Sequence, residues 1–156
     1  MTNAPQDATT DTDSFWDSYQ RHKTAIAEAN TLNKEVVFDD LIAAGITQVD
    51  VSFDGEGDSG QIEYVAARAG ERTVEFPPAP VTLHKTEFGS EELTAREMPL
   101  REAVEELCYG YLEQEYGGWE NNDGAFGEFT FHVAERRIAL DFNARITDYS
   151  HTPHVF

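Results

Sequence analysis

Two short segments of the chain combine carboxylate and amide side chains with glycines. The first runs from Asp54 to Gly60 with the sequence DGEGDSG, and the second runs from Gly117 to Gly124 with the sequence GGWENNDG. Glycine allows the backbone to turn tightly, and carboxylate and amide oxygens are the ligands that hard cations prefer. Acidic side chains on a surface also attract basic partners. The two segments therefore predict either a cation site or a surface for a basic partner, and the sequence leaves both open.

The first segment resembles a calcium-binding loop only in part. Asp54, Glu56 and Asp58 alternate as the first, third and fifth ligands of such a loop do. Ser59, however, stands where the sixth position requires glycine, and Val65 stands where the twelfth requires a bidentate glutamate. The segment is therefore not an EF-hand. An irregular oxygen-ligand site and a hairpin turn, in which glycines and acids serve geometry and solubility, remain as interpretations.

The second segment places polar side chains directly after a tryptophan. Trp119 follows a pair of glycines that ends the preceding helix, and it is suited to anchoring the loop to the core. The residues after it are free to project or to bond their own backbone: Glu120, Asn121, Asn122 and Asp123. Asn and Asp commonly satisfy the turns that they form, so a purely structural loop is one interpretation. The other is a ligand pocket shared with Asp54 and Asp58.

Two candidate sites can be assembled from these segments. The first is a partner-binding or ligand-binding surface made of Asp54, Glu56, Asp58, Glu63, Trp119, Glu120, Asn121, Asn122 and Asp123. The second is a divalent-metal site, in which two histidines near the chain end join the carboxylates. Its members are Asp54, Asp58, Glu120, Asp123, His151 and His154. A histidine pair beside a proline is more often a plain surface tail, and the chain has neither paired cysteines nor a His-Glu-x-x-His motif.

No arrangement of residues typical of nucleophilic catalysis is present. Ser59 lies in an Asp-Ser-Gly sequence, but Gln61 replaces the second glycine of a nucleophile elbow. There is no phosphate-binding glycine motif followed by lysine. General acid–base chemistry by His132 with Asp141 or Glu128 requires only that these side chains lie close together. The sequence leaves enzymatic activity open but favours a protein that is not an enzyme.

The charge of the chain restricts its partners. Thirty acidic residues face 11 basic ones, which gives a net charge of -19 over 156 residues. Such a chain repels phosphates, so we expect no direct nucleic-acid binding. Three interpretations remain: a surface adapted to solubility or salt, imitation of the phosphate charge of DNA, and cation binding.

Other features place the protein in a class. No apolar run is long enough to span a membrane and no secretion signal is recognised, so we expect a cytoplasmic protein that does not bind membranes. The single cysteine, Cys108, excludes an intramolecular disulfide and lies on the apolar stripe of a predicted helix, where a buried thiol is expected. The oligomeric state is not indicated.

Hydrophobic periodicity predicts the elements that position these residues. Residues 1–12 are polar, which predicts a disordered arm. Residues 13–156 are predicted to form one α+β domain with a helical region over 13–45. That region divides into a helix from Ser14 and a second from Lys34 to Ala44, closed by Gly45. Alternating segments predict strands, and Pro99 starts a further helix that the Gly117 pair ends. The expected strands are 49–53, 61–64, 73–76, 129–133 and 138–142, with 81–83 an edge strand at most and 86–98 a loop.

We therefore expect an antiparallel sheet of about four to five strands with helices on one face. Strict alternation assigns six apolar residues to the helix side: Val51, Phe53, Ile62, Tyr64, Phe131 and Leu140. It assigns the opposite, open face the polar set Asp50, Ser52, Asp54, Glu63, Glu128, Thr130, His132 and Asp141. The open face is thus expected to be rich in carboxylates, and both glycine-flanked segments are expected to meet at one rim of the sheet.

The motifs resemble a bacterial family that is known only as a domain of unknown function. The resemblance rests on residues 51–63, on residues 117–124 and on a histidine-containing tail, and it extends roughly from Phe38 to His154. It implies no activity. Members of that family are often encoded on plasmids and integrative elements, which implies a regulatory or anti-defence role. The N-terminal helical stretch lies outside the clear resemblance.

The sequence as a whole leads to one hypothesis and one alternative. The hypothesis is an acidic interaction protein that binds a basic protein, as a DNA-mimic-like regulator or inhibitor of nucleic-acid machinery. The alternative is a divalent-metal-binding protein, including a metal-dependent hydrolase.

Overall fold

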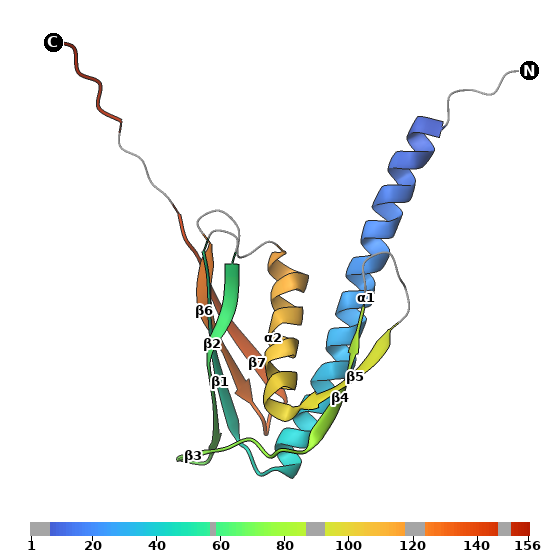
Figure 1. Cartoon of the computed structure of the whole chain (residues 1–156), viewed down its shortest axis with the longest axis vertical. Coiled ribbons are helices and arrows are strands. Elements are labelled where there is room, and N and C mark those ends of the chain that lie inside the picture. Colours follow the sequence, from blue (N-terminus) through green and yellow to red (C-terminus); the bar gives the residue numbers. More distant parts are fainter. Residues whose placement is uncertain (1–6, 57–58, 87–92, 118–123, 147–150) are drawn as a thin grey trace, which may run out of the picture.

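The computed structural model describes residues 7–56, 59–86, 93–117, 124–146 and 151–156. These residues form two helices, a five-stranded antiparallel sheet in the order β3-β2-β1-β6-β7, and a separate two-stranded hairpin (Figure 1). This arrangement confirms the predicted α+β class and sheet. The elements are α1 (Asp7–Ala43), β1 (Gln48–Glu56), β2 (Ser59–Ala69), β3 (Arg72–Val74), β4 (Pro80–Lys85), β5 (Thr94–Pro99), α2 (Leu100–Tyr116), β6 (Ala125–His132) and β7 (Arg137–Ala144).

Helix α1 is one continuous helix of 37 residues, where the sequence suggested two segments after a disordered arm. It begins at Asp7, inside the range expected to be disordered, and an acidic residue suits a helix N-terminus. Asn33, at the expected break, is buried and exchanges two hydrogen bonds with the backbone of His84 in β4. These hydrogen bonds to β4 stabilise the helix at the position where the sequence alone predicted a break. Gly45 closes the helix as predicted, with φ of 75° and an Ile46 N–H bond to Leu41 O.

Helix α2 packs between the sheet and α1. Pro99 directly precedes it and Gly117 follows it, as expected. Cys108 is fully buried on its inner face, and burial raises the pKa of the thiol well above its ordinary value. The two helices are in close contact at Gly110, where an added methyl group would collide with the Asn30 side chain. Asn30 donates a hydrogen bond to Gln114 across this contact, at 2.8 Å.

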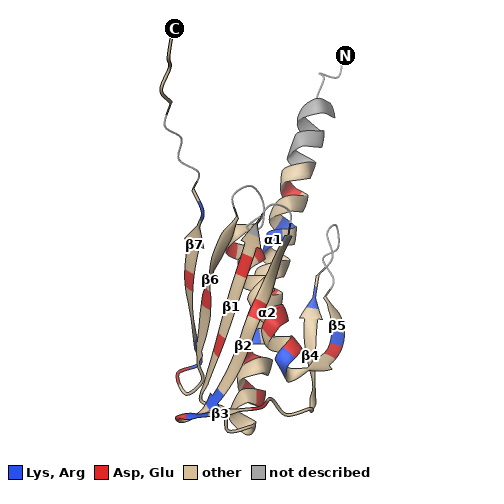
Figure 2. Cartoon of the chain, turned by 60° about the vertical axis from the view of Figure 1, so that its left-hand side comes forward, with Lys and Arg blue, Asp and Glu red and all other residues tan. Residues whose placement is uncertain are grey.

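The sheet buries one face and leaves the other open. The inner face packs against the helices through large residues such as Phe53, Phe129 and Phe131. Phe38 of α1 lies 5.8 Å from Phe131, measured between ring centroids, so α1 also reaches the sheet. No described residue covers the opposite side, which we call the open face (Figures 1 and 2). The predicted alternation along β1 and the predicted second hairpin, now β6–β7, are both confirmed.

The assignment of Tyr64 to the helix side is wrong. The pairing of β1 with β2 shifts between Ser52 and Phe53, because Ser52 opposes Tyr64 whereas Phe53 opposes Ile62. Glu63 is therefore the extra residue of a β-bulge, and beyond it the alternation of β2 is reversed. Tyr64 points to the open face and is 57% exposed.

The expected loop over 86–98 contains strand β5. Met98 is the only buried residue of this strand, so its sequence lacks the alternation of apolar and polar residues that predicts a strand. Pairing with β4 decides its conformation, since Val81 and Leu83 of β4 are buried against the helices and hold the hairpin in place. Tertiary packing here overrides a weak local preference.

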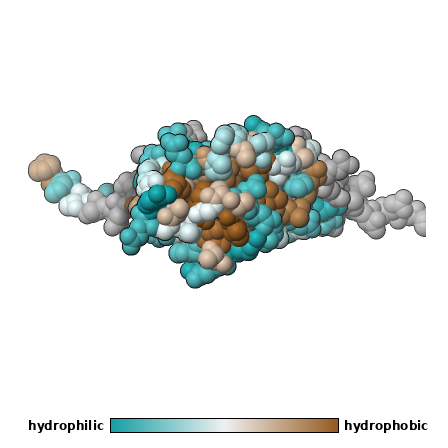
Figure 3. Space-filling model, turned by 90° about the horizontal axis from the view of Figure 1, so that it is seen from below, coloured by the Kyte–Doolittle hydropathy of each residue, from teal (hydrophilic) through white to brown (hydrophobic). Residues whose placement is uncertain are grey.

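The end of the molecule where α1 stops exposes apolar surface (Figure 3). A shallow pocket of about 210 Å³ lies there, lined by Asp40, Ala43, Ala44, Pro77, Ala79, Val81 and Leu100.

Candidate interaction surface

The first glycine-flanked segment joins β1 to β2, and the second ends where β6 begins, at the same end of the sheet. Gly55 pairs with Gly60 on one side and with Ala125 on the other, so the described ends of both segments are adjacent. We call this edge, formed by Asp54, Gly55, Gly60 and Ala125, the rim. The remaining predicted members Asp58, Trp119, Glu120, Asn121, Asn122 and Asp123 lie outside the described residues. Glu56 is the last residue of β1.

Arginine 145 occupies the rim, directly after β7. The guanidinium of Arg145 donates to the Asp54 carboxylate at 2.9–3.0 Å and to the Gly55 carbonyl at 2.8 Å. It also lies 5.0 Å from the centre of the Phe126 ring. Asp54 is thus paired with a cation of the chain itself, and a metal ion there would have to displace it. Arg145 was not among the predicted site residues, because it lies 91 positions from Asp54 in the sequence.

The proposed histidine ligands are not near Asp54 in any described cluster. His151 and His154 belong to an exposed C-terminal stretch, where the ring of His154 stacks on Phe156 at 6.0 Å. Within the described ranges, no three His, Cys, Asp or Glu side chains gather in a way that could hold a metal ion.

The open face carries its own arginines as well as carboxylates. Arg68 lies 3.7 Å from Asp50, and Gln48 donates to the same carboxylate at 3.0 Å. Together with the Arg145–Asp54 pair, this neutralises the acids near both ends of β1. The open face is therefore less uniformly acidic than its alternating sequence suggested, because the arginines come from strands whose register the sequence did not reveal.

Two carboxylates on the open face lack such partners. Glu128 of β6 lies directly opposite Asp141 of β7, both are exposed, and neither has a cationic partner among the described residues. Ser52 of β1 opposes Glu128, and Tyr64 of β2 opposes Ser52, so a row of an aromatic, a hydroxyl and two acids crosses four strands. Phe126, two residues before Glu128, is 44% exposed on the same face. Glu63 is also exposed, at the bulge.

The acid–base group suggested from sequence does not assemble on this face. His132 lies opposite Arg137, at the far end of β6 from the Glu128–Asp141 pair. Four residues of strand separate His132 from Glu128, which corresponds to about 13 Å. Glu128 and Asp141 are thus brought together, and His132 is not.

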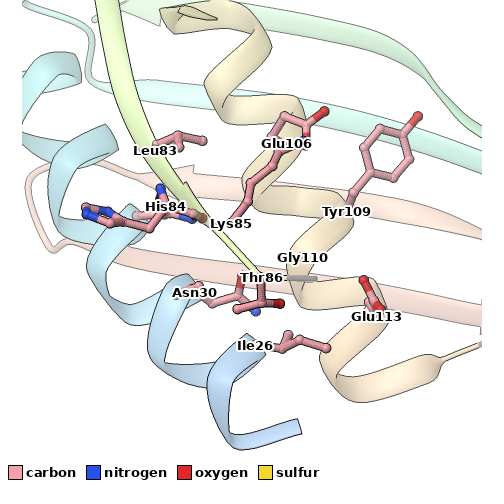
Figure 4. A pocket seen from close by; sticks show the side chains of 12 residues that line it. Ile26, Asn30, Leu83, His84, Lys85, Thr86, Glu106, Tyr109, Gly110 and Glu113 are labelled. Atoms are coloured by element: carbon pink, nitrogen blue, oxygen red, sulfur yellow. Dashed lines mark hydrogen bonds and ion pairs between the residues drawn. The ribbon is translucent and has the colours of Figure 1, made fainter. Parts of the chain in front are cut away.

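A small pocket with polar and apolar lining lies on the helix side of the molecule, between α1, β4 and α2 (Figure 4). Its volume is about 180 Å³, and an ion pair between Lys85 and Glu106 spans it at 3.0 Å. Glu113 and Thr86 also line it, and His84 Nδ1 is buried without a hydrogen-bond partner. Because Lys85 forms its ion pair with Glu106, it does not neutralise Glu113, whose carboxylate can therefore bind a cationic group. Separated segments build this pocket, which is why the sequence did not indicate it.

Most basic side chains of the chain are used within the fold. Among the described residues, ion pairs involve Arg68, Lys85, Arg96, Arg101, Arg136, Arg137 and Arg145. Arg136, at the β6–β7 turn, binds Glu35 and Asp39 of α1, and its hydrogen bond to Asp39 raises its pKa. The surplus of acids is therefore left at the surface.

Comparisons with known proteins place the chain in a family. Within the described ranges, neither helix combines the length and apolar character that crossing a bilayer requires. No curated protein and no solved structure matches the chain significantly. The model of one family, described as a family of unknown function, matches residues 29–156 and so covers most of the sequence. The chain belongs to this family of unknown function, DUF6878.

Proposed function

We propose that this protein is an acidic interaction protein whose open face binds a basic surface of a protein partner. The observation that carries the proposal is the opposed pair Glu128 and Asp141 on an uncovered sheet face. Like charges directly opposite each other on neighbouring strands destabilise a sheet. A cationic group from a partner, placed between the two carboxylates, removes that repulsion.

The surroundings of the pair suit an arginine-bearing partner. A guanidinium binds carboxylates through two parallel hydrogen bonds and also stacks on aromatic rings. Tyr64 and Phe126 offer exposed rings on the same face. Arg145 over Phe126 is an example of such stacking within the chain. Asp50 and Asp54 on this face already have an arginine each, whereas Glu128 and Asp141 are two opposed acids, so an external cation gains most at this pair.

The class of partner follows from charge. A surface with a net charge of -19 repels nucleic acids and attracts proteins that carry positive patches. Proteins that bind nucleic acids present such patches, because their ligand is a polyanion. We therefore propose nucleic-acid machinery as the partner class and inhibition or regulation by competition with DNA or RNA as the effect. The divalent-metal alternative has no comparable support, since Asp54 already binds Arg145.

The test is capture of partners by a charge-matched pair of variants. Glu128→Gln/Asp141→Asn removes the opposed carboxylates, and Glu28→Gln/Glu97→Gln removes two exposed acids from other surfaces with the same change in net charge. Proteins retained from a cell extract at low salt are identified and quantified for the wild type and both variants. We expect basic nucleic-acid-binding proteins to be retained by the wild type and the control, lost by the first variant and released by salt. Equal loss in both variants, or retention of no basic protein, contradicts the proposal.

A further inference from the structure

The edge of the sheet at β3 is only partly paired. Strand β2 spans 11 residues, but the three-residue β3 pairs only with residues 67–69 at its end. The same register, continued, would set Phe76 opposite Val65 and Pro77 opposite the residue before it. Proline has no N–H to donate, so β3 does not continue, and the chain leaves the sheet and runs to β4 (Figure 1). Before residue 67, the outer edge of β2 is therefore open.

The backbone of Val65 faces this open edge. The Arg68 carbonyl accepts a hydrogen bond from Thr47, on the β1 side of β2, and successive residues of a strand direct their backbone groups to opposite edges. Ala67 therefore faces β3, with which it pairs, and Val65 faces the same way. Among the described residues, no hydrogen bond is formed by the Val65 N–H or carbonyl at this edge. Val65 is only 9% exposed, and backbone groups of such residues are nearly always paired.

A groove of about 470 Å³ lies along this open edge, and we call it the edge groove. It is lined by residues 64–67 of β2, by residues 73–78 on and after β3, and by Pro99 and Arg101 at the start of α2. Its volume is in the range of about 300–1,000 Å³ that is typical of ligand pockets. Most of its lining is apolar or aromatic, as at Phe76 and Pro77.

The edge groove keeps one carboxylate without a counter-ion. Arg101 lies 3.8 Å from Glu105 in the next turn of α2, so its charge is already offset. Glu75 is exposed and forms no ion pair with any described residue. The groove thus combines an unpaired backbone donor and acceptor, an apolar lining and a free acid.

We propose that the edge groove binds an extended segment of a protein partner, which adds to β2 as an antiparallel strand in line with β3. Opposite residues of an antiparallel pair exchange two hydrogen bonds, and Val65 offers both the donor and the acceptor for one such exchange. In strand addition, main-chain bonds supply affinity and contacts of alternate side chains supply specificity. Apolar side chains of the segment fit the lining, and a basic one is attracted by Glu75.

The same geometry argues against other occupants. A net charge of -19 repels nucleic acids. A second copy paired through the same edge and centred on Val65 would set its residue 63 opposite Ala67, a place that β3 already fills. A short segment avoids this obstacle by ending, or turning away, opposite Val65. The inference does not depend on the partner proposed for the open face, because its hydrogen bonds come from the edge of β2.

The first test selects short random peptides, displayed on phage, against the full chain and measures amide hydrogen exchange with the selected peptides. We expect sequences that combine apolar residues with Lys or Arg. A peptide at about ten times its dissociation constant is expected to slow exchange of the Val65 amide about tenfold. The amide of Tyr64, which faces β1, is the internal control and is expected to be unchanged. Selection of no peptide, or of peptides that leave Val65 unchanged, overturns the proposal.

The second test methylates the backbone nitrogens of a selected peptide one at a time. In an added strand, neighbouring N–H groups point to opposite sides, so only one of two neighbours bonds to β2. Methylation of the nitrogen that donates to the Val65 carbonyl is expected to weaken binding about tenfold, as loss of one hydrogen bond does. Methylation at the next residue is expected to have little effect. Equal effects at neighbouring positions contradict strand addition.

The third test uses a charge-matched pair of variants. Glu75→Lys changes the edge groove, whereas Glu71→Lys makes the same change of charge in the exposed turn between β2 and β3, outside the groove. A selected peptide that carries Lys or Arg is expected to bind several-fold more weakly to the first variant than to the second. Equal weakening contradicts binding in the groove. A full chain that dimerises in sedimentation equilibrium and is dissociated by the peptide identifies a second copy as the occupant and also overturns the proposal.

Discussion

A single hydrogen bond links α2 to the irregular part of the sheet. The backbone N–H of Ile62, next to the bulged Glu63, donates to the Tyr109 hydroxyl at 2.7 Å. A bulge interrupts the regular ladder of strand hydrogen bonds, so a side chain has to supply a partner for the group concerned. Burial raises the pKa of Tyr109, and the bond from Ile62 partly opposes this. The tyrosine thus holds the bulge that turns Tyr64 to the open face.

Replacement of Tyr109 by phenylalanine tests this link. The change removes the acceptor and leaves the Ile62 N–H unsatisfied, so the free energy of unfolding should fall by about 1–2 kcal/mol. Urea unfolding of Tyr109→Phe measures it, and Tyr116→Phe, whose hydroxyl has no such bond among the described residues, serves as the control. Equal stability of the Tyr109 variant and the control would show that the bond contributes nothing.

Glu105 predicts a pH dependence of stability. Burial raises the pKa of this carboxyl above 4.5, with smaller effects in the same direction from Glu102 and Glu106 and an opposing effect from Arg101. A raised pKa in the folded state means that this group's stabilising contribution is complete below pH 4.5 and is lost as the pH rises through the raised value. Glu105→Gln should therefore melt at a higher temperature than the wild type at neutral pH, and the difference should shrink towards zero below pH 4.5. Thermal melts over this range provide the measurement; a variant that is less stable at neutral pH contradicts the assignment.

At the scale of elements, regular local patterns were predictable and irregular pairings were not. The periodicity of α2 and the alternation of β6 and β7 appear directly in the sequence, since each buries one regular face. The bulge at Glu63 and the polar strand β5 depend on what packs or pairs with them, and the sequence contains no local signal for either. The same limit applies to the site. Strand parity predicted which acids lie on the open face, but it gave no sign that Arg145, which follows β7, contacts Gly55 at the rim.

Gly127 shows how closely the central strands approach each other. It pairs with Phe142 in β6–β7, and a methyl group there would collide with the Asp141 backbone and with the Phe53 ring. Gly127→Ala should destabilise the protein by about 3 kcal/mol or more, because the nearer obstacle is the Asp141 backbone and the other is the ring of the buried Phe53. Chemical denaturation is the measurement. Gly117→Ala, where the added atom makes only ordinary contact, is the matched control, and similar values for the two variants contradict the packing described.

At the scale of the whole molecule, charged residues fall into two groups. Some form ion pairs within the fold, and the remaining acids are available to a partner. Most basic side chains are used inside the chain, as at Arg136 and Lys85, and the acids exceed them by a wide margin. This imbalance was evident in the composition, but only the structure distinguishes the neutralised carboxylates from the free ones.

The imbalance predicts how salt acts on stability. Repulsion among surface carboxylates opposes the compact state, and salt screens it over about 10 Å at 0.1 M ionic strength. The melting temperature should therefore rise as sodium chloride is added, although individual surface ion pairs are weakened. A melting temperature that falls with salt would mean that the ion pairs outweigh the repulsion. Differential scanning calorimetry measures this, and repeating it at two protein concentrations shows whether salt-dependent self-association contributes.

The most direct measurement of the central claim is an NMR titration with a short arginine-rich peptide at low salt. The account predicts that amide shifts concentrate on the open face around Glu128 and Asp141, and that Glu128→Gln/Asp141→Asn weakens binding several-fold more than Glu28→Gln/Glu97→Gln, which changes the net charge equally. Shifts centred on the helices, or equal weakening by both variants, would mean that net charge alone attracts cations and that the open face is not the binding surface.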